Sequence, residues 1–321
     1  MKSKKIMEPN NNNFSYLMTA GFFAVFLVSV VFYLGVKPED VAAEPSLSAI
    51  IFGSPEPDYP VVTFLPVDIF PNEVNFSRKP EVKAESALIY DLTNDKPLFE
   101  KEPQKRLLIA SLTKLMTALV ASENIKDAKQ RLFVLDEDLK IENPYNDLKS
   151  GDNFNLEEAL HFILIRSDNA VANVLGRSVF KEGSKFFVFE MNRKAQQLKM
   201  ENTLFYDPIG LASNISTVYD MKNLAKEILK SYQGIFLISK IPEIKVISPA
   251  GLAFNLKNTN TLVSKIQGIL GSKTGFTPEA SGSLLVIFKD GQKMILSLVL
   301  GSQDRFKDSQ TLIDWYWRYR N

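Results

Sequence analysis

Short apolar blocks that alternate with polar turns run along residues 82–321 and predict the elements of a globular domain. The blocks with the character of strands lie at 86–90, 97–101, 269–276, 282–288 and 293–300. The last two form a hairpin that turns at Asp290-Gly291. Strands lie at both ends of the region and helices between them. We therefore expect one α/β domain, of the α+β kind, whose sheet is built from both ends.

Longer segments with helical spacing of their apolar residues fill the middle of this region. Helices are expected over 111–120, 156–165, 170–178, 185–198, 217–232 and 304–318. Asn155 and either Ser216 or Thr217 stand where N-cap residues belong. The tripeptide Ser167-Asp168-Asn169 then falls in a loop between two helices.

The N-terminal part of the chain differs from the rest in composition. Residues 16–36 contain no charged side chain, and as a helix they would be roughly 31 Å long, enough to cross a bilayer. Lys2, Lys4 and Lys5 precede them, which favours a cytoplasmic N-terminus. We expect a disordered cytoplasmic tail (1–15), a transmembrane signal anchor (16–36), a proline-rich spacer (37–81) and an extracytoplasmic domain (82–321). A cleaved signal peptide is the alternative, although its apolar region would run only about 7–15 residues.

Composition excludes several kinds of chemistry. The chain has no cysteine and one histidine, His161, so thiol nucleophiles and disulfides are excluded and a histidine-ligated zinc site nearly so. We expect neither metal nor cofactor. A net charge of +1 gives no sign of a nucleic-acid partner. His161 lies in an apolar segment, where a packed structural histidine is expected, and lysine is left as the natural base for a serine nucleophile.

Ser111 and Lys114 lie three residues apart at the start of an apolar helical segment. Residues at this spacing share one face of a helix. A neutral serine needs a neighbouring base, and a lysine serves only if burial or nearby cations lower its pKa. The alternative is an ordinary helix terminus, with Ser111 as its cap and Lys114 exposed to solvent.

Two further triplets favour the catalytic interpretation. Ser167-Asp168-Asn169 and Lys273-Thr274-Gly275 follow the Ser111-x-x-Lys114 pair in that order. This ordered set is typical of penicillin-binding proteins and class A β-lactamases. Lys273 and Thr274 offer a cation and a hydroxyl to a carboxylate, and Gly275 allows close approach to the strand. Lys273 is also expected to lower the pKa of Lys114 by repulsion.

The chain resembles serine-type D-alanyl-D-alanine carboxypeptidases, the low-molecular-weight penicillin-binding proteins, over about residues 82–318. Flanking runs carry the likeness beyond the triplets: 110–121, Met191-Asn192-Arg193-Lys194-Ala195, Thr203-Leu204-Phe205, Pro208-Ile209-Gly210-Leu211 and Asn258-Thr259-Asn260. The resemblance implies the DD-peptidase/β-lactamase-like fold, in which an antiparallel sheet flanked by helices lies beside an all-helical lobe.

The same resemblance implies roles for eight residues. Ser111 would be the acylated nucleophile, Lys114 its general base, and Ser167 the relay of a proton to the leaving amine. Asn169 would bind the substrate backbone, and Lys273 and Thr274 its terminal carboxylate. Gly275 and Phe276 would line the same site, with the backbone N–H groups of Ser111 and Phe276 forming an oxyanion hole.

The expected function is removal of the terminal D-alanine from peptidoglycan stem peptides by an enzyme of the bacterial cytoplasmic membrane. β-Lactam antibiotics would be its covalent inhibitors. A DD-endopeptidase acting on cross-links, a class A-like β-lactamase and a catalytically dead wall-binding protein are the alternatives. The β-lactamases need a deacylating glutamate. Here Glu201-Asn202-Thr203-Leu204-Phe205 has phenylalanine where their motif has an asparagine that holds the water.

Overall fold

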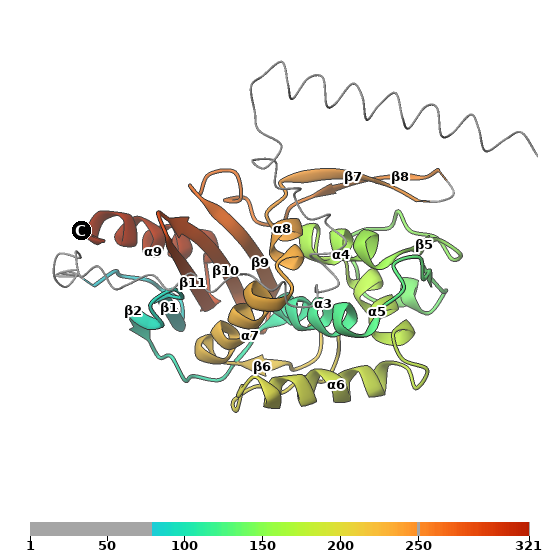
Figure 1. The fold of residues 1–321 in the computed structure, drawn as a ribbon, viewed down its shortest axis with the longest axis horizontal. Helices are drawn as coiled ribbons and strands as arrows, with labels where there is room; N and C mark the ends of the chain where they lie inside the picture. The colour runs from blue at the N-terminus through green and yellow to red at the C-terminus, as the bar shows by residue number, and fades with distance from the viewer. Residues whose placement is uncertain (1–78, 249–250, 321) are drawn as a thin grey trace, which may run out of the picture. The chain divides into compact units, whose positions relative to one another are not determined.

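A computed structural model describes residues 79–248 and 251–320 (Figure 1). The expected tail, membrane anchor and all but the last three residues of the spacer lie outside the described residues. Within the described ranges, no helix combines the length and the apolar character needed to span a bilayer.

The domain is built on a five-stranded antiparallel sheet with strand order β2-β1-β11-β10-β9. Its strands are β1 (Ser86–Asp91), β2 (Lys96–Lys101), β9 (Ile269–Thr277), β10 (Ser281–Asp290) and β11 (Lys293–Ser302). The first strand pairs with the last, so that Ser86 lies opposite Leu300 and Asp91 opposite Ile295. The prediction of a sheet built from both ends of the domain is confirmed.

Both faces of the sheet are apolar because each packs against a hydrophobic core, and successive side chains of a strand point alternately to the two cores. In β11, Leu296, Leu298 and Leu300 belong to the core beneath the central helices. Ile295 and Val299 face the opposite core, which includes Trp315 and Tyr316 of α9 (Arg305–Tyr319). Helix α9 packs on β10 and β11, so the sheet lies between two layers of helices (Figure 1).

Helix α3 (Thr113–Asn124) is the centre of the helical lobe. It contacts α4 (Leu156–Ile165), α5 (Asn169–Ser178), α6 (Ser184–Gln197), α7 (Val218–Ser231) and α8 (Gly234–Ser239). Ten of the twelve residues of α3 are buried, as expected for a helix surrounded by others. This lobe lies beside the β9 end of the sheet (Figure 1), which confirms the expected α+β architecture.

Side-chain caps fix the starts of the predicted helices. The amide oxygen of Asn155 accepts from the backbone N–H of Glu158, whose carboxylate accepts in turn from the N–H of Asn155. The side chains of Thr217 and Asp304 cap α7 and α9 by accepting the backbone N–H groups of Asp220 and Lys307. The prediction for the serine triplet needs one correction: Asp168 caps α5, so Asn169 is the first residue of that helix rather than part of the loop.

Several short elements were not predicted. They are β3 (Leu107–Leu108), η2 (Ala110–Leu112), η3 (Asp138–Lys140), β5 (Asn153–Phe154), β6 (Ile215–Ser216), α8, β7 (Glu243–Ile247) and β8 (Ala253–Lys257). The short strand β4 (Leu132–Phe133) instead falls in a run of strand character at 132–135. The β7–β8 hairpin extends over α4 (Figure 1), where Phe254 packs on the rings of Phe154 and Phe162. A helix over 111–120 was expected, but a 3₁₀ turn carries Ser111 and the α-helix begins at Thr113.

Candidate active site

The 3₁₀ turn η2 presents Ser111 between two glycines of distant segments. A Cβ atom on Gly275 would lie 2.7 Å from the carbonyl oxygen of Ile109 and 3.3 Å from the nitrogen of Ser111. A Cβ atom on Gly210 would lie 2.1 Å from the oxygen of Ala110. Ala110 itself has φ +45°, a conformation that disfavours any residue with a Cβ. The backbone around the serine is therefore tightly confined.

Lys114 lies directly behind the serine, and its side chain is completely buried. Its Nζ donates to Oγ of Ser111 at 2.9 Å, to Oδ1 of Asn169 at 2.8 Å and to the carbonyl of Ile209 at 2.8 Å. All three acceptors are neutral. Burial lowers the pKa of Lys114 to about 7, and it outweighs the carboxylates of Asp168 and Asp207, which act in the opposite direction. The lysine can therefore accept a proton near neutral pH.

The second and third triplets meet through Lys273 on β9. Its Nζ donates to Oγ of Ser167 at 2.8 Å and to the carbonyl of Thr274 at 3.0 Å. Burial lowers the pKa of Lys273 well below its ordinary value, and the charges of Lys114 and Arg305 lower it further. The expected repulsion between Lys114 and Lys273 is therefore present, and it disfavours the state in which both amines are charged.

Ser167 stands on a strained turn. Its φ is +62°, a region that a serine occupies only when its surroundings require it. The next two residues supply those surroundings: Asp168 caps α5 through the N–H of Val171, and the amide of Asn169 donates to the carbonyl of Glu142 at 2.7 Å. The turn directs Ser167 toward Lys273 and Asn169 toward Lys114.

Thr274, Gly275 and Phe276 follow Lys273 along the edge strand of the sheet. Oγ1 of Thr274 shares a hydrogen bond of 2.6 Å with Oγ1 of Thr259. The ring of Phe276 is 59% exposed, with the guanidinium carbon of Arg305 5.5 Å from its centroid. The eight predicted site residues therefore form two connected groups, one around Lys114 and one around Lys273.

Some residues that build the site were not predicted. The carbonyl of Ile209 accepts a hydrogen bond from Lys114. This carbonyl belongs to a loop in which the carboxylate of Asp207 accepts hydrogen bonds from the backbone N–H groups of residues 209–212. Asn214 ties this loop to Thr113 of α3. The run 208–211 was noted only as part of the family likeness, because no sequence pattern assigns a role to a backbone carbonyl.

Two other sequence features have no part in the described site. Nδ1 of His161 pairs with the carbonyl of Glu157 at 2.8 Å within α4, as expected for a packed structural histidine. Glu201 is exposed in the turn after α6, and Phe205 is buried in the core. Among the described residues, no cluster of three or more His, Asp and Glu side chains is arranged to hold a metal ion.

The geometry agrees with the comparison to known families. The profile of the D-alanyl-D-alanine carboxypeptidase family, Peptidase_S11, matches residues 73–304. The chain belongs to this family. The turn that carries Ser111, the turn that carries Ser167 and the strand that carries Lys273 all lie within the range of this S11 protein that the family profile matches. The resemblance to D-alanyl-D-alanine carboxypeptidases is confirmed.

Individual relatives add detail. The chain is 31% identical over 68% of its length to the D-alanyl-D-alanine carboxypeptidase DacF of Bacillus subtilis, and it spans 58% of that protein. It is also 31% identical over 74% of its length to a D-alanyl-D-alanine endopeptidase of Escherichia coli, of which it spans 78%. The solved structure of penicillin-binding protein D2 from Listeria monocytogenes, in its ampicillin-bound form, is similar with a TM-score of 0.67 and 28% identity. That similarity covers 75% of this chain and 99% of the Listeria chain.

Proposed function

We propose that this S11 protein is a serine DD-carboxypeptidase that removes the terminal D-alanine of peptidoglycan stem peptides through an acyl-enzyme on Ser111. The observation that carries the proposal is the contact of 2.9 Å between Nζ of Lys114 and Oγ of Ser111. A lysine whose pKa burial lowers to about 7 is neutral in a large fraction of molecules at physiological pH and can act as a base.

In the first step, Oγ of Ser111 attacks the carbonyl carbon of the penultimate D-alanine as its proton passes to Nζ of Lys114. The N–H groups of Ser111 and Phe276 stabilise the oxyanion that forms. The C–N bond then breaks, and Ser167, bonded to Lys273, relays the proton taken up by Lys114 to the leaving amine, receiving one proton as it gives one. Water hydrolyses the resulting ester and regenerates Ser111.

Lys273 and Thr274 would bind the terminal carboxylate of the substrate. An arriving anion favours the charged form of a buried lysine, which offsets the lowering of its pKa by burial. The hydroxyl of Thr274 adds a donor that Thr259 orients. Peptides that end in a carboxylate would therefore bind better than peptides whose C-terminus is amidated.

β-Lactams are the expected covalent inhibitors, in agreement with the ampicillin-bound form of the Listeria relative. A class A-like β-lactamase needs a glutamate beside the acyl group, whereas Glu201 is exposed on a turn. We expect a long-lived penicilloyl-enzyme whose lifetime Glu201→Gln does not change.

A DD-endopeptidase that cleaves cross-links is the second candidate. It is supported by similarity, because the chain is 31% identical over 74% of its length to the E. coli endopeptidase. Synthetic cross-linked dimers and linear pentapeptides, supplied at equal concentration, separate the two activities. If D-alanine is released from the linear peptide faster than the dimer is cleaved to monomers, the result supports the carboxypeptidase.

Labelling with a fluorescent penicillin tests the nucleophile. Wild-type protein should be labelled covalently, and Ser111→Ala should not, because the acylated atom is gone. The matched control is Ser178→Ala at the end of α5, which should label like wild type. Undiminished labelling of Ser111→Ala would contradict the assignment, and a folded wild type that takes no label would favour the dead wall-binding protein.

We also propose that the catalytic domain lies outside the cytoplasmic membrane. The proposal is supported by the uncharged segment 16–36 after three lysines and by the extracytoplasmic position of peptidoglycan. Protease added to spheroplasts should digest the domain while cytoplasmic markers survive. A protected domain would reverse this topology, and release of the domain into the medium would favour a cleaved signal peptide.

A further inference from the structure

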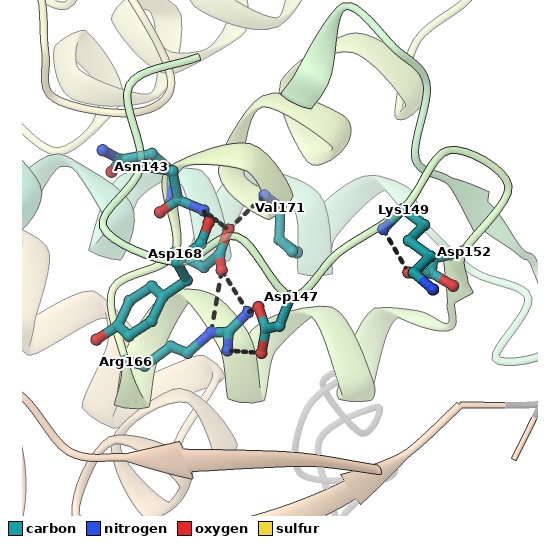
Figure 2. Close-up of polar contacts among 9 residues, drawn as sticks. Asn143, Asp147, Lys149, Asp152, Arg166, Asp168 and Val171 are labelled. Carbon is teal, nitrogen blue, oxygen red and sulfur yellow. Dashed lines mark hydrogen bonds and ion pairs between the residues drawn. The ribbon is translucent and has the colours of Figure 1, made fainter. Parts of the chain in front are cut away.

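Arg166 precedes the turn that carries Ser167, here called the serine turn, and is almost completely buried, with 2% of its surface exposed. Its guanidinium lies between two carboxylates (Figure 2). Nε donates to Oδ2 of Asp168 at 3.0 Å, and Nη1 and Nη2 donate to the two oxygens of Asp147 at 2.7 and 2.9 Å. A buried cation requires such partners, and the two-pronged geometry uses the planar fork of arginine fully.

Aromatic rings hold the guanidinium in place. Its central carbon lies 4.4 Å from the centroid of Tyr145 and 4.7 Å from that of Phe162, within the range of cation–π attraction. Phe162 belongs to α4, and Tyr145 and Asp147 belong to the segment 142–147. Arg166 therefore joins α4, this segment and the N-terminus of α5 at one point.

The contacts of the arginine continue to the reacting groups. Asn143 donates to Oδ1 of Asp168 at 3.2 Å and accepts the backbone N–H of Asn169 at 3.3 Å. The carbonyl of Glu142 accepts the side-chain amide of Asn169, which leaves Oδ1 of that amide for Lys114. Segment 142–147 thus sets which way the amide of Asn169 faces.

We propose that Arg166 is a positioning residue for acylation. By binding Asp147 and Asp168 together, it holds segment 142–147 against the serine turn, places Ser167 and Asn169 against the two lysines, and neutralises the charge of Asp168 near Lys114. This role rests on the proposed function, since it concerns the same serine and lysine.

The charge of Asp168 gives the role a signature that a purely structural role lacks. Asp168, Asp207 and Lys273 are the charged groups that face Lys114 from α5, from the loop at 207–214 and from β9, and the two carboxylates raise the pKa of Lys114. Removing Arg166 leaves Asp168 uncompensated, so the ammonium form of Lys114 persists to higher pH. Removing the charge of Asp168 has the opposite effect.

The test measures the second-order rate of acylation by a fluorescent penicillin between pH 5 and 9, using the full chain in mild detergent. The wild-type rate should rise with pH around the titration of Lys114. Arg166→Met should lower the plateau rate about 10²-fold, because reacting groups are displaced, and should shift the rise to higher pH. Asp168→Asn keeps an oxygen to cap α5 and should shift the rise to lower pH.

Arg177→Met is the matched control. Arg177 lies on α5 and, like Arg166, binds a buried carboxylate, that of Asp138, at 2.8 Å, but its other partners are the carbonyl of Phe133 and the carboxylate of Glu137. This variant should lower the melting temperature without moving the pH profile. Arg166→Lys keeps the charge but not the fork, so its profile should keep the wild-type midpoint at a reduced rate.

The role of Arg166 is overturned if the pH profiles of Arg166→Met and Asp168→Asn shift in the same direction. It is also overturned if Arg166→Met acylates with the wild-type rate and pH profile. If Arg166→Met does not fold, a wild-type rate in Arg166→Lys, or a shift of the profile of Asp168→Asn to higher pH, overturns the role instead. Failure of the proposed function looks different, because wild-type protein would then take no label at all.

Discussion

The two buried lysines of the site are solvated by neutral oxygens. Lys114 is bonded to a hydroxyl, an amide and a backbone carbonyl, and Lys273 to a hydroxyl and a carbonyl. Neutral acceptors compensate a full charge poorly, so burial lowers the pKa of both amines. The resulting reactivity at neutral pH is obtained at the expense of stability, because the unfolded chain holds these protons more tightly.

Lys114→Met should reveal this expense in the pH dependence of unfolding. Between about pH 8 and 10 the unfolded wild type binds a proton at Lys114 that the folded protein lacks, so wild-type stability rises with pH. Relative to the variant, the free energy of unfolding should rise by up to about 1.4 kcal/mol per pH unit. Urea unfolding at several pH values measures it, and parallel curves for the two proteins would contradict the burial of a titrating amine.

The sequence alone predicted that Ser111 and Lys114 lie together, but not which residues hold them in place. Ser111 and Lys114 share a helical spacing, so their contact followed from local geometry. The contact of Lys273 with Ser167 crosses 106 residues, and only the family resemblance related the two. No sequence pattern pointed to the carbonyl of Ile209, because a backbone oxygen is present in every residue type. None pointed to the role of Arg166 either, because its contacts depend on a segment about twenty residues earlier in the chain.

At the scale of elements, the close approach of β9 to η2 decides the shape of the site. The strand passes near enough to the 3₁₀ turn that only a residue without a Cβ fits at Gly275. The same approach brings the edge strand beside Ser111. Glycine is used here for space, whereas at Gly291 it is used for a turn with φ +55°.

Gly275→Ala should therefore strongly reduce the rate of acylation, although it adds only one methyl group. The added methyl would lie 2.7 Å from the oxygen of Ile109, so β9 and η2 must separate. We expect a loss of about 1–3 kcal/mol in stability and about 10²-fold in the rate of labelling. Gly291→Ala, which adds its methyl to open space, should lose about 1–2 kcal/mol from its backbone conformation and label normally. Equal labelling of the two variants would contradict the steric explanation.

Regular elements with strong periodicity were predictable, and irregular ones were not. The predicted helix over 156–165 agrees with α4, because an amphipathic run follows a capping box there. The 3₁₀ turn η2 depends instead on tertiary contacts with Gly210 and Gly275. The β7–β8 hairpin was missed because its strands are short and half-exposed, and their burial comes from packing on α4 rather than from a continuous apolar run.

At the scale of the molecule, Asp308 joins the two ends of the domain. It lies on α9 and is 5% exposed. Its carboxylate accepts the backbone N–H groups of Lys83 and Ala84 at 3.0 and 2.8 Å and the hydroxyl of Ser302 at 2.6 Å. The segment that leads from the spacer into β1 is thus held by the last helix.

Asp308→Ala should destabilise the whole domain by about 1–3 kcal/mol, because three donors, two of them in buried hydrogen bonds, lose their acceptor. Asp314→Ala on the same helix is the control. Asp314 is exposed and, among the residues that the structure describes, accepts a hydrogen bond from Gln310 alone, so its loss should change stability by less than about 0.5 kcal/mol. Thermal or urea unfolding compares them, and equal losses would show that the junction at Asp308 is unimportant.

The pairing of β1 with β11 has a consequence for biogenesis. Ser86 and Leu300 are neighbours in the sheet, yet the ribosome makes them 214 residues apart. At about 5–20 residues per second, β1 waits roughly 10–40 s for its partner. Throughout that interval its apolar faces and unpaired backbone are open to other chains. A nascent chain of this kind is a natural client for chaperones, and most of its vulnerability ends only when its last strand arrives.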